Sequence, residues 1–307
     1  NKWGIIVFHM SQNFRLDKTG YINRDKKISF KFNGKKYFGY EGDTLASALL
    51  ANGIHLIGRS FKYHRPRGFI GAGVDEPNAH VQLYSGAKTE PNAIATTVEL
   101  VEGLVATSQN CWPSVSFDFG AINNLLNKFF PAGFYYKTFM WPKNFWYKIY
   151  EPIIRKAAGL GVAPLKPDPD RYEHKFEYCD VLIAGSGPSG LASALAAAKN
   201  GARVILAEDK PRFGGSLLTD EVTIGNKKGK DWADETISQL KSMPNVIVKN
   251  RSQVFGYYDH NMMVMFERTK DHIENPTEFT PRQRLWYIRA KEVIVSTGSI
   301  ERPLVFG

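Results

Sequence analysis

The hydrophobic pattern of residues 27–53 predicts a hairpin followed by a helix. Apolar and polar residues alternate on both sides of Asn33-Gly34, a dipeptide typical of the two-residue turn between antiparallel strands. A run of small and apolar residues over 45–52 then predicts a helix, and Thr44 is suited to cap its start. This order of elements predicts a β-grasp, or ferredoxin-like, module.

The pattern changes in the second half, where an apolar run meets a turn paced by glycines. Residues 181–184 are all apolar, which predicts a strand buried on both faces, and an alanine-rich stretch typical of a helix follows the turn. Between strand and helix the glycines have the GxGxxG spacing of dinucleotide-binding folds. Gly185 permits the tight turn, Gly187 lets a pyrophosphate approach the backbone, and Gly190 lets helix and strand pack closely. The amides at the start of the helix would then face the phosphates.

Residues beyond this turn extend the same prediction. A second strand, 203–207, ends in Glu208, where a carboxylate can accept both hydroxyls of an adenine ribose and favours NAD over NADP. A second glycine pair ends in Gly215, and Thr297-Gly298, after a further strand, resembles a closing turn of flavoproteins with two dinucleotide sites. The choice between NAD and FAD stays open. So does the alternative that these are ordinary glycines of an α/β domain.

Composition limits the broad class of the protein. At 307 residues, 43% hydrophobic and 23% charged, the chain is that of a globular protein with about two domains. Its net charge of +10 fits nucleic acid, an acidic partner subunit or an anionic cofactor, and nucleic acid is set aside because no motif for it accompanies the charge. The two cysteines, Cys111 and Cys179, are far apart, which argues against a disulfide framework, a zinc site or an iron–sulfur cluster and fits a cytoplasmic protein. No apolar stretch is long enough to span a membrane.

The predicted fold is α+β in the first half and α/β in the second. A β-grasp module without a cluster precedes a Rossmann-like domain of the two-dinucleotide flavoprotein type, which is expected to be incomplete because the chain stops soon after a central strand. Residues 1–9 are expected to be non-native. The predicted boundaries are 1–24 for an N-terminal tail, 25–107 for the β-grasp module, 108–175 for an aromatic helical and linker segment, and 176–307 for the nucleotide-binding domain.

A cationic and aromatic segment carries a resemblance to a known family. Residues 59–68 (RSFKYHRPRG) and 75–79 (DEPNA) resemble the N-terminal part of the alpha subunits of heterotetrameric sarcosine oxidases, and residues 42–53 and 255–261 agree with it. Related modules of other amine and opine dehydrogenases have cysteines in the loop after the basic segment and hold a 2Fe-2S cluster. The loop here, 71–79, has none. The resemblance therefore implies a ferredoxin fold that has lost its cluster and does not transfer electrons.

The resemblance also implies a function and a set of cofactors. In such enzymes sarcosine is oxidised at its methylamine to glycine, oxygen is reduced to hydrogen peroxide, and the one-carbon unit passes to tetrahydrofolate. The alpha subunit is expected to hold NAD, with FAD as the alternative, while FMN lies at an interface and FAD on the beta subunit. Beta, gamma and delta subunits are the expected partners. The residues implied to bind the cofactor are Gly185, Gly187, Ser189, Gly190, Glu208, Asp209, Lys210, Gly215, Ser216 and Val254.

The match at this site is incomplete, and no pattern in the chain supplies the amine-oxidising chemistry. The family usually has Asp where Glu208 stands and Arg where Lys210 stands, so the charges agree while the hydrogen bonds differ. His64, His80 and His260 are interpreted as structural, and the catalytic site is expected on another subunit. Two alternatives stay open: a self-contained FAD-dependent amine or opine dehydrogenase subunit, and a scaffold that binds no nucleotide.

Two further segments have competing interpretations. The cations of residues 59–67 form either a solvated surface or a packed interface with a subunit or the flavin domain, with phosphate contact as a third option. Residues 117–163 are rich in aromatic side chains, but lysines interrupt every apolar run. This pattern favours short helices within a larger assembly over membrane association.

Overall fold

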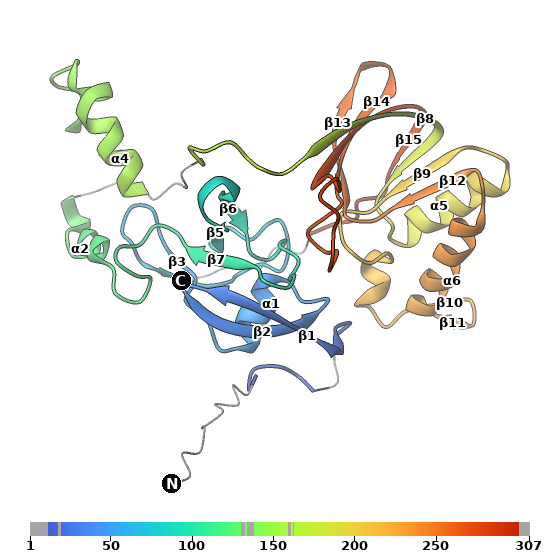
Figure 1. Ribbon diagram of the computed structural model, residues 1–307, viewed down its shortest axis with the longest axis horizontal. Helices are drawn as coiled ribbons and strands as arrows, with labels where there is room; N and C mark the ends of the chain where they lie inside the picture. The colour runs from blue at the N-terminus through green and yellow to red at the C-terminus, as the bar shows by residue number, and fades with distance from the viewer. Residues whose placement is uncertain are drawn as a thin grey trace, which may run out of the picture. The chain divides into compact units, whose positions relative to one another are not determined.

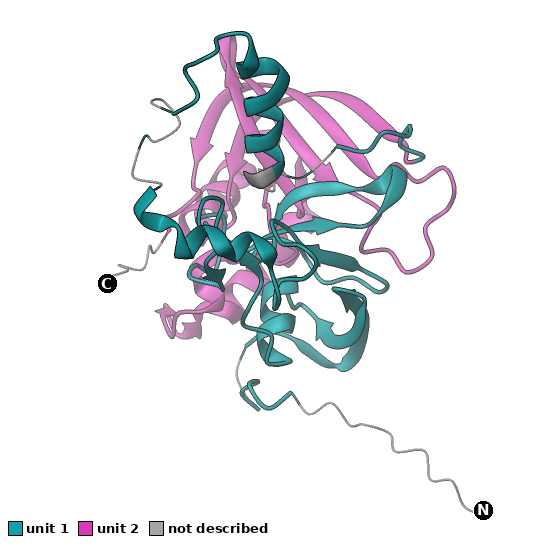
Figure 2. Cartoon of the chain, turned by 90° about the vertical axis from the view of Figure 1, so that its left-hand side faces the viewer, with its two compact units in different colours: residues 1–169, 301–307 teal, residues 170–300 magenta. Residues whose placement is uncertain are grey.

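The structure, a computed structural model, divides into two compact units, which are described separately (Figures 1 and 2). Unit 1 extends to residue 169 and unit 2 comprises residues 170–300. The expectations about residues 1–9 and about the end of the chain concern parts outside the described residues. The structure describes residues 12–17, 20–129, 133, 138–158, 161 and 163–300.

Unit 1 is built on a five-stranded mixed sheet. The predicted hairpin is confirmed, since β1 (Asn23–Phe32) and β2 (Lys35–Glu41) pair in antiparallel fashion. The turn residues Asn33 and Gly34 have φ of 49° and 79°, the left-handed conformation that a two-residue hairpin turn requires. From β1 the sheet continues to the parallel β7 (Val105–Ser108) and then to the antiparallel β5 (His80–Leu83) and β6 (Glu90–Ile94).

The predicted helix is also confirmed, as α1 (Leu45–Ala51), which packs against this sheet. Thr44 Oγ1 accepts a hydrogen bond from Ser47 N at 3.1 Å, and Ser47 Oγ accepts one from Thr44 N at 3.0 Å. This reciprocal capping box satisfies two backbone amides at the helix start. Helix and strands share one hydrophobic core, whose buried members include Ile28, Phe30, Phe32, Leu45, Leu49 and Val81.

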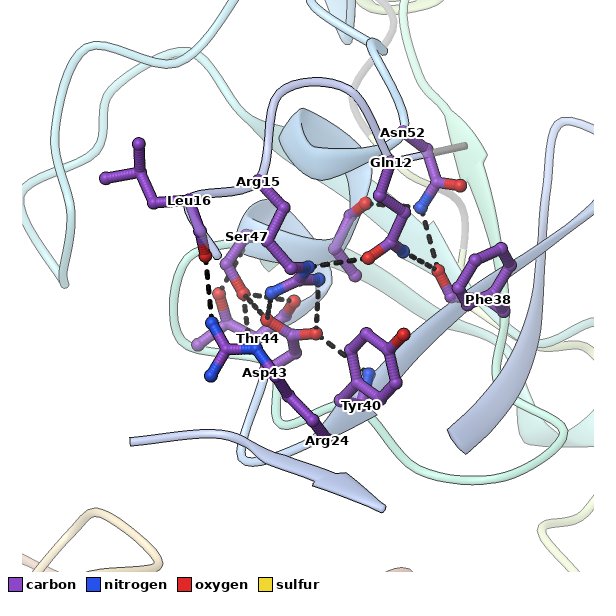
Figure 3. Close-up of polar contacts among 11 residues, drawn as sticks. Gln12, Arg15, Leu16, Arg24, Phe38, Tyr40, Asp43, Thr44, Ser47 and Asn52 are labelled. Atoms are coloured by element: carbon purple, nitrogen blue, oxygen red, sulfur yellow. Dashed lines mark hydrogen bonds and ion pairs between the residues drawn. The ribbon is translucent and has the colours of Figure 1, made fainter. Parts of the chain in front are cut away.

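A buried carboxylate ties the N-terminal arm, residues 12–17, to this helix (Figure 3). Asp43 is 2% exposed and accepts two hydrogen bonds from the Arg15 guanidinium, at 3.0 and 2.7 Å. It also accepts from Tyr40 N at 2.9 Å and from Ser47 Oγ at 2.7 Å. Because a guanidinium and a carboxylate join through two parallel bonds, the pair holds the arm in one orientation.

The basic segment forms a hairpin that packs on residues 110–124 of the same unit. Arg59 Nε donates to a backbone carbonyl of that stretch at 2.8 Å. The buried His64 places Nδ1 2.6 Å from Asp118 Oδ2. At Arg59 and His64 the structure thus favours a packed segment over a solvated one, and the contact is with the chain's own residues. The hairpin consists of β3 (Gly58–Arg59) and β4 (Pro66–Arg67).

The aromatic segment forms short helices, as predicted, and carries exposed aromatic side chains. Tyr147, in a π-helical turn, is 82% exposed, and Trp141, in the bend before it, is 81% exposed. Within the described ranges, no helix combines the length and apolar character that a membrane crossing needs. The described helices of this segment include α2 (Ile122–Leu125), the 3-10 turns Phe119–Ala121 and Asn127–Phe129 on either side of it, a π-helical turn over Trp146–Tyr150, and α4 (Glu151–Ala158).

Unit 2 contains a six-stranded sheet with a parallel and an antiparallel part. The two longest strands, β8 (Tyr172–Ala184) and β15 (Gln283–Val295), pair in parallel from end to end. Beyond β8 lie the parallel β9 (Val204–Ala207) and β12 (Val246–Lys249), and beyond β15 lies the antiparallel hairpin of β14 (Met262–Arg268) and β13 (Ser252–Tyr258).

The apolar run at the end of β8, residues 182–184, and the whole of β9 are buried on both faces, as predicted. Ile183 and Leu206 point into one core, which they share with the helices, whereas Leu182 and Ile205 point into a second core with Trp286. Neighbouring strand residues alternate between faces, so a run without polar residues implies two buried faces. The helices are α5 (Pro188–Lys199) and α6 (Gly229–Ser242), and a small ladder of β10 (Thr223–Ile224) and β11 (Lys227–Lys228) precedes α6.

Candidate nucleotide-binding site

The candidate site lies where β8 ends and α5 begins, at the carboxyl end of the parallel strands. Gly185 follows the strand with φ of 102°, and a Cβ there would lie 2.3 Å from the Ser296 carbonyl oxygen. Gly187 is the N-cap of α5, and Pro188 takes the first helical position, where its missing N–H costs nothing. Position 185 therefore requires glycine for both conformation and space.

The glycines of the turn differ in what a side chain would meet. A Cβ at Gly190 would lie 2.0 Å from the Gly185 carbonyl oxygen, so helix and strand pack too closely for any side chain. At Gly187 no atom lies within 4 Å of the Cβ position, and the backbone is extended, with φ of −67° and ψ of −175°. Open space thus lies before the N-terminus of a helix, where backbone amides attract an anion. The backbone of Gly215 lies close to that of Gly187, since a Cβ at position 215 would lie 2.8 Å from Gly187 Cα.

Glu208 lies at the end of β9 and is already bonded to the glycine turn. Its carboxylate accepts hydrogen bonds from Ser186 N at 3.0 Å, from the Ser186 hydroxyl, and from Lys210 N at 3.1 Å. A carboxylate has about four lone-pair positions, and the side chain of Asp209 forms a further hydrogen bond with Glu208. For two ribose hydroxyls to bind, some of these bonds must be exchanged. The Ser186 hydroxyl oxygen also accepts a hydrogen bond from Gly214 N at 3.2 Å. If this hydroxyl rotated away from Glu208, Gly214 N would keep the Ser186 carbonyl oxygen, at 3.1 Å, as its acceptor.

Burial changes the proton affinity of Glu208, which is 5% exposed. Loss of solvation, with a smaller contribution from Asp209, raises the pKa of Glu208 from 4.5 to about 7, while hydrogen bonds from Ser186 and Lys210 oppose the rise. Between these two pH values the Glu208 carboxyl stays protonated in the folded chain but is ionised in the unfolded chain. The contribution of this group to the free energy of unfolding is therefore fully present at low pH and is lost as the pH rises from 4.5 to about 7.

Glu208→Gln is expected to remove this pH dependence, because the amide does not titrate. The full effect is on the order of 3 kcal/mol of unfolding free energy. Urea denaturation of both proteins from about pH 4 to about pH 8 measures it. Asp220→Asn, a change at an exposed carboxylate, is the control and should leave the pH profile unchanged. A wild-type-minus-Gln difference that is flat over this range would show that folding does not raise the pKa of Glu208.

Four further predicted residues have exposed side chains around the turn. Ser189 lies in the first turn of α5, and Ser216 lies in the 3-10 helix Gly215–Leu218 that follows the second glycine pair. Asp209 and Lys210 come directly after Glu208. Their side chains are therefore accessible to a ligand from solvent, and their contact with a nucleotide stays a prediction.

Strand β13 brings Val254 to the same end of the sheet. Ser252 N donates to the Glu208 carbonyl at 2.7 Å, so the start of β13 lies beside the end of β9. Val254 is partly buried against the second core. Sequence reasoning missed Ser186, which is fully buried and bonded to Glu208. The signal that could have found it was its place between the first two glycines of the motif.

The three histidines considered in the sequence lie on different elements. His64 lies in the basic hairpin, His80 begins β5, and His260 lies in a 3-10 turn of unit 2. In the part of the chain that the structure describes, no group of three or more His, Cys, Asp or Glu side chains is arranged to hold a metal ion. No catalytic role is assigned to these residues.

Comparison with known proteins defines the class of the chain. A family described as "2Fe-2S iron-sulfur cluster binding domain" matches residues 25–111, and one described as "FAD dependent oxidoreductase" matches residues 180–254. L-proline dehydrogenase from P. horikoshii has a similar fold, with a TM-score of 0.54 and 19% identity over 92% of this chain and 43% of that chain. The chain thus combines a ferredoxin-like module with a Rossmann-like domain of the FAD-dependent oxidoreductase type, which confirms the predicted fold class.

More specifically, the chain is a homologue of sarcosine oxidase alpha subunits, and the predicted resemblance is confirmed. It is 54% identical to the alpha subunit of sarcosine oxidase from Rhizobium meliloti (strain 1021), over 96% of this chain and 30% of that protein. Its identity to the corresponding subunit from Corynebacterium sp. (strain U-96) is 33%, over 93% of this chain and 25% of that protein. An opine oxidase subunit from Rhizobium meliloti is 28% identical over 42% of this chain and 24% of that protein. The chain spans less than a third of the length of the two sarcosine oxidase subunits.

Proposed function

We propose that unit 2 binds NAD, with the pyrophosphate against the open backbone at Gly187 and the adenine ribose at Glu208. The observation that carries this proposal is the open space at Gly187, beside glycines 185 and 190 whose Cβ atoms would collide with backbone. Packing within the chain gives no reason for glycine at 187, whereas a ligand lying against the main chain does. FAD is the alternative occupant, because the family that matches residues 180–254 is described as FAD-dependent.

The other predicted residues take supporting roles in this proposal. Gly185 permits the turn, and the amides of Gly187, Ser189, Gly190 and Gly215 donate to phosphate oxygens. The acidic and basic residues after Glu208 flank the ribose, and the side chain on β13 contacts the adenine. The residues assigned in this way are Gly185, Gly187, Ser189, Gly190, Asp209, Lys210, Gly215, Ser216 and Val254.

We further propose that the chain is part of the cofactor-binding subunit of an oxidoreductase that acts on CH-NH donors. The support is its homology to sarcosine oxidase alpha subunits. The proposed reaction of the complex is oxidation of sarcosine to glycine, with oxygen reduced to hydrogen peroxide and the one-carbon unit passed to tetrahydrofolate. FMN at an interface and FAD on a partner subunit supply the redox chemistry when bound. This chain's residues hold and orient the nucleotide.

Beta, gamma and delta subunits are the proposed partners, in the cytoplasm. An aromatic cluster of unit 1 supports an interface: Trp112 and Phe117 each lie with ring centroids 5.1 Å from Phe119, yet the three are 55% to 68% exposed. Large aromatic residues held in one cluster are typical of interface hot spots. The double substitution Trp112→Ser and Phe119→Ser is expected to weaken co-purification with the partner subunits without changing the nucleotide content. Unchanged co-purification would place the interface elsewhere.

Nucleotide content tests the proposal and separates the alternatives. The full-length subunit is produced without its partners and denatured, and released nucleotides are identified by liquid chromatography and mass spectrometry. About one NAD per chain is the expected result for a single site. Stoichiometric FAD would instead support a self-contained dehydrogenase subunit. A folded protein without nucleotide would contradict the proposal and support a scaffold.

A further inference from the structure

The residues of the ferredoxin-like module do not fit the 2Fe-2S cluster that its family description names. Such a cluster is held by four thiolates, or by two thiolates and two imidazoles. Within the matched residues, 25–111, the only cysteine is Cys111. The loop after the basic hairpin, residues 68–79, contains neither cysteine nor histidine. Its ionisable side chains are the carboxylates of Asp75 and Glu76, which are not ligands of this kind of cluster.

The same loop is organised around the buried carboxylate of Glu76, which is 2% exposed. Glu76 Oε2 accepts hydrogen bonds from Ile70 N and Gly71 N, both at 2.6 Å. Its Oε1 accepts from Asn78 N at 2.7 Å and from Ala79 N at 3.3 Å. A carboxylate has about four lone-pair positions, and backbone amides from both ends of the loop occupy all of them.

The rest of the loop packs closely around this carboxylate. A Cβ at Gly71 would lie 3.2 Å from Glu76 N, so the chain at the two ends of the turn is nearly in contact. Thr96, which is 6% exposed, donates its hydroxyl to the Gly73 carbonyl at 2.7 Å. Ala79 at the end of the loop is fully buried in the core of unit 1. The carboxylate therefore joins the loop to the core.

Amides directed at one anionic centre are also what an iron–sulfur site presents, where N–H groups donate to the cluster sulfurs. Buried amides are costly without an acceptor, so a loop of this shape needs an anion to close around. We propose that the Glu76 carboxylate takes the place of the cluster as the internal anion of this loop. The module consequently folds without metal, and this holds whether or not unit 2 binds a nucleotide.

Metal content is the first test of this proposal. The full-length subunit is purified from iron-replete cells, and a second sample is incubated anaerobically with ferrous iron and sulfide. Both are assayed chemically for iron and acid-labile sulfide, because bound flavin would obscure the visible spectrum. Neither element is expected in stoichiometric amount. Stoichiometric iron and sulfide in either sample would overturn the proposal.

Glu76→Gln tests the charge and hydrogen bonding while keeping the side-chain shape. The glutamine amide keeps one acceptor oxygen for one pair of backbone N–H groups, but its NH2 group faces the other pair and cannot accept from it. The amides of the pair that loses its acceptor are expected to exchange hydrogen about tenfold faster or more. In Glu76→Ala both pairs lose their acceptor, and all four amides are expected to exchange faster. Glu102→Gln is the matched control, because that exposed carboxylate also accepts from a backbone amide, Ser29 N at 2.8 Å.

Exchange at the four loop amides, measured by NMR or mass spectrometry, decides the outcome. The Glu102 control should leave them unchanged. If Glu76→Gln keeps wild-type exchange at all four amides, the carboxylate does not organise the loop and the proposal is wrong. That result would decide the matter even if Glu76→Ala failed to fold.

Discussion

Gly187→Val is expected to lose its nucleotide while the chain stays folded. The new side chain meets no atom within 4 Å of its Cβ, and the extended backbone at 187 suits any residue. Unfolding free energy should therefore stay within about 1 kcal/mol of wild type. The isopropyl group would occupy the space before α5 and separate the phosphates from the helix amides, which should weaken nucleotide affinity on the order of a hundredfold. Nucleotide content after purification and calorimetric titration measure this loss.

Gly190→Val is the matched control, because the same side chain at this position is expected to lower the stability of the fold instead of only blocking the nucleotide. Its Cβ would lie 2.0 Å from the Gly185 carbonyl oxygen, so helix and strand must separate. A loss of about 3 kcal/mol of stability is expected, measured by urea denaturation. If folded Gly187→Val protein kept full nucleotide content, the nucleotide would not lie at this turn.

Asp43→Ala is expected to give the largest loss of stability in unit 1. The change leaves the Arg15 guanidinium, Tyr40 N and the Ser47 hydroxyl without the acceptor that they share. Breaking a buried ion pair by removing one partner costs about 3–5 kcal/mol. Amide exchange of α1 is the local measurement, because the two units need not unfold together.

An exposed ion pair of the same sheet provides the comparison. Lys26 Nζ lies 3.0 Å from Glu41 Oε1, with side chains 52% and 46% exposed, so Glu41→Ala should cost about 0.5 kcal/mol. The stability loss in Arg15→Ala should lie between those of Asp43→Ala and Glu41→Ala, since Asp43 keeps its bonds from Tyr40 and Ser47. Equal exchange rates of the α1 amides in Asp43→Ala and Glu41→Ala would show that the Asp43 carboxylate does not stabilise the helix.

Several elements could be predicted because their signals are local. The Asn33-Gly34 turn follows from the left-handed conformation that few residue types adopt, and the start of α1 follows from the hydroxyl of Thr44. The strand before Gly185 was identifiable from an apolar run without alternation. In each case the physical cause acts within a few residues of the chain.

The polar contacts that organise both units could not be predicted in this way. Arg15 pairs with Asp43 across 28 residues, His64 with Asp118 across 54, and Ser186 with Glu208 across 22. Each pair depends on which polar side chains the packed core leaves near each other. Glu76 differs, since its partners are close in sequence. Only burial, which the sequence pattern of the loop does not reveal, makes its carboxylate the acceptor for all four amides.

By itself, then, the sequence determined the first hairpin with its helix, and the strand, turn and helix at the glycine motif, because backbone conformation and hydrophobic periodicity are local properties. The tertiary structure decided that the basic hairpin packs on its own unit, that Glu208 is bonded to Ser186 before any ligand arrives, and that Glu76 closes the loop. These are choices of hydrogen-bond partner in places removed from water, and the partner available to a buried group is known only once the chain has folded around it.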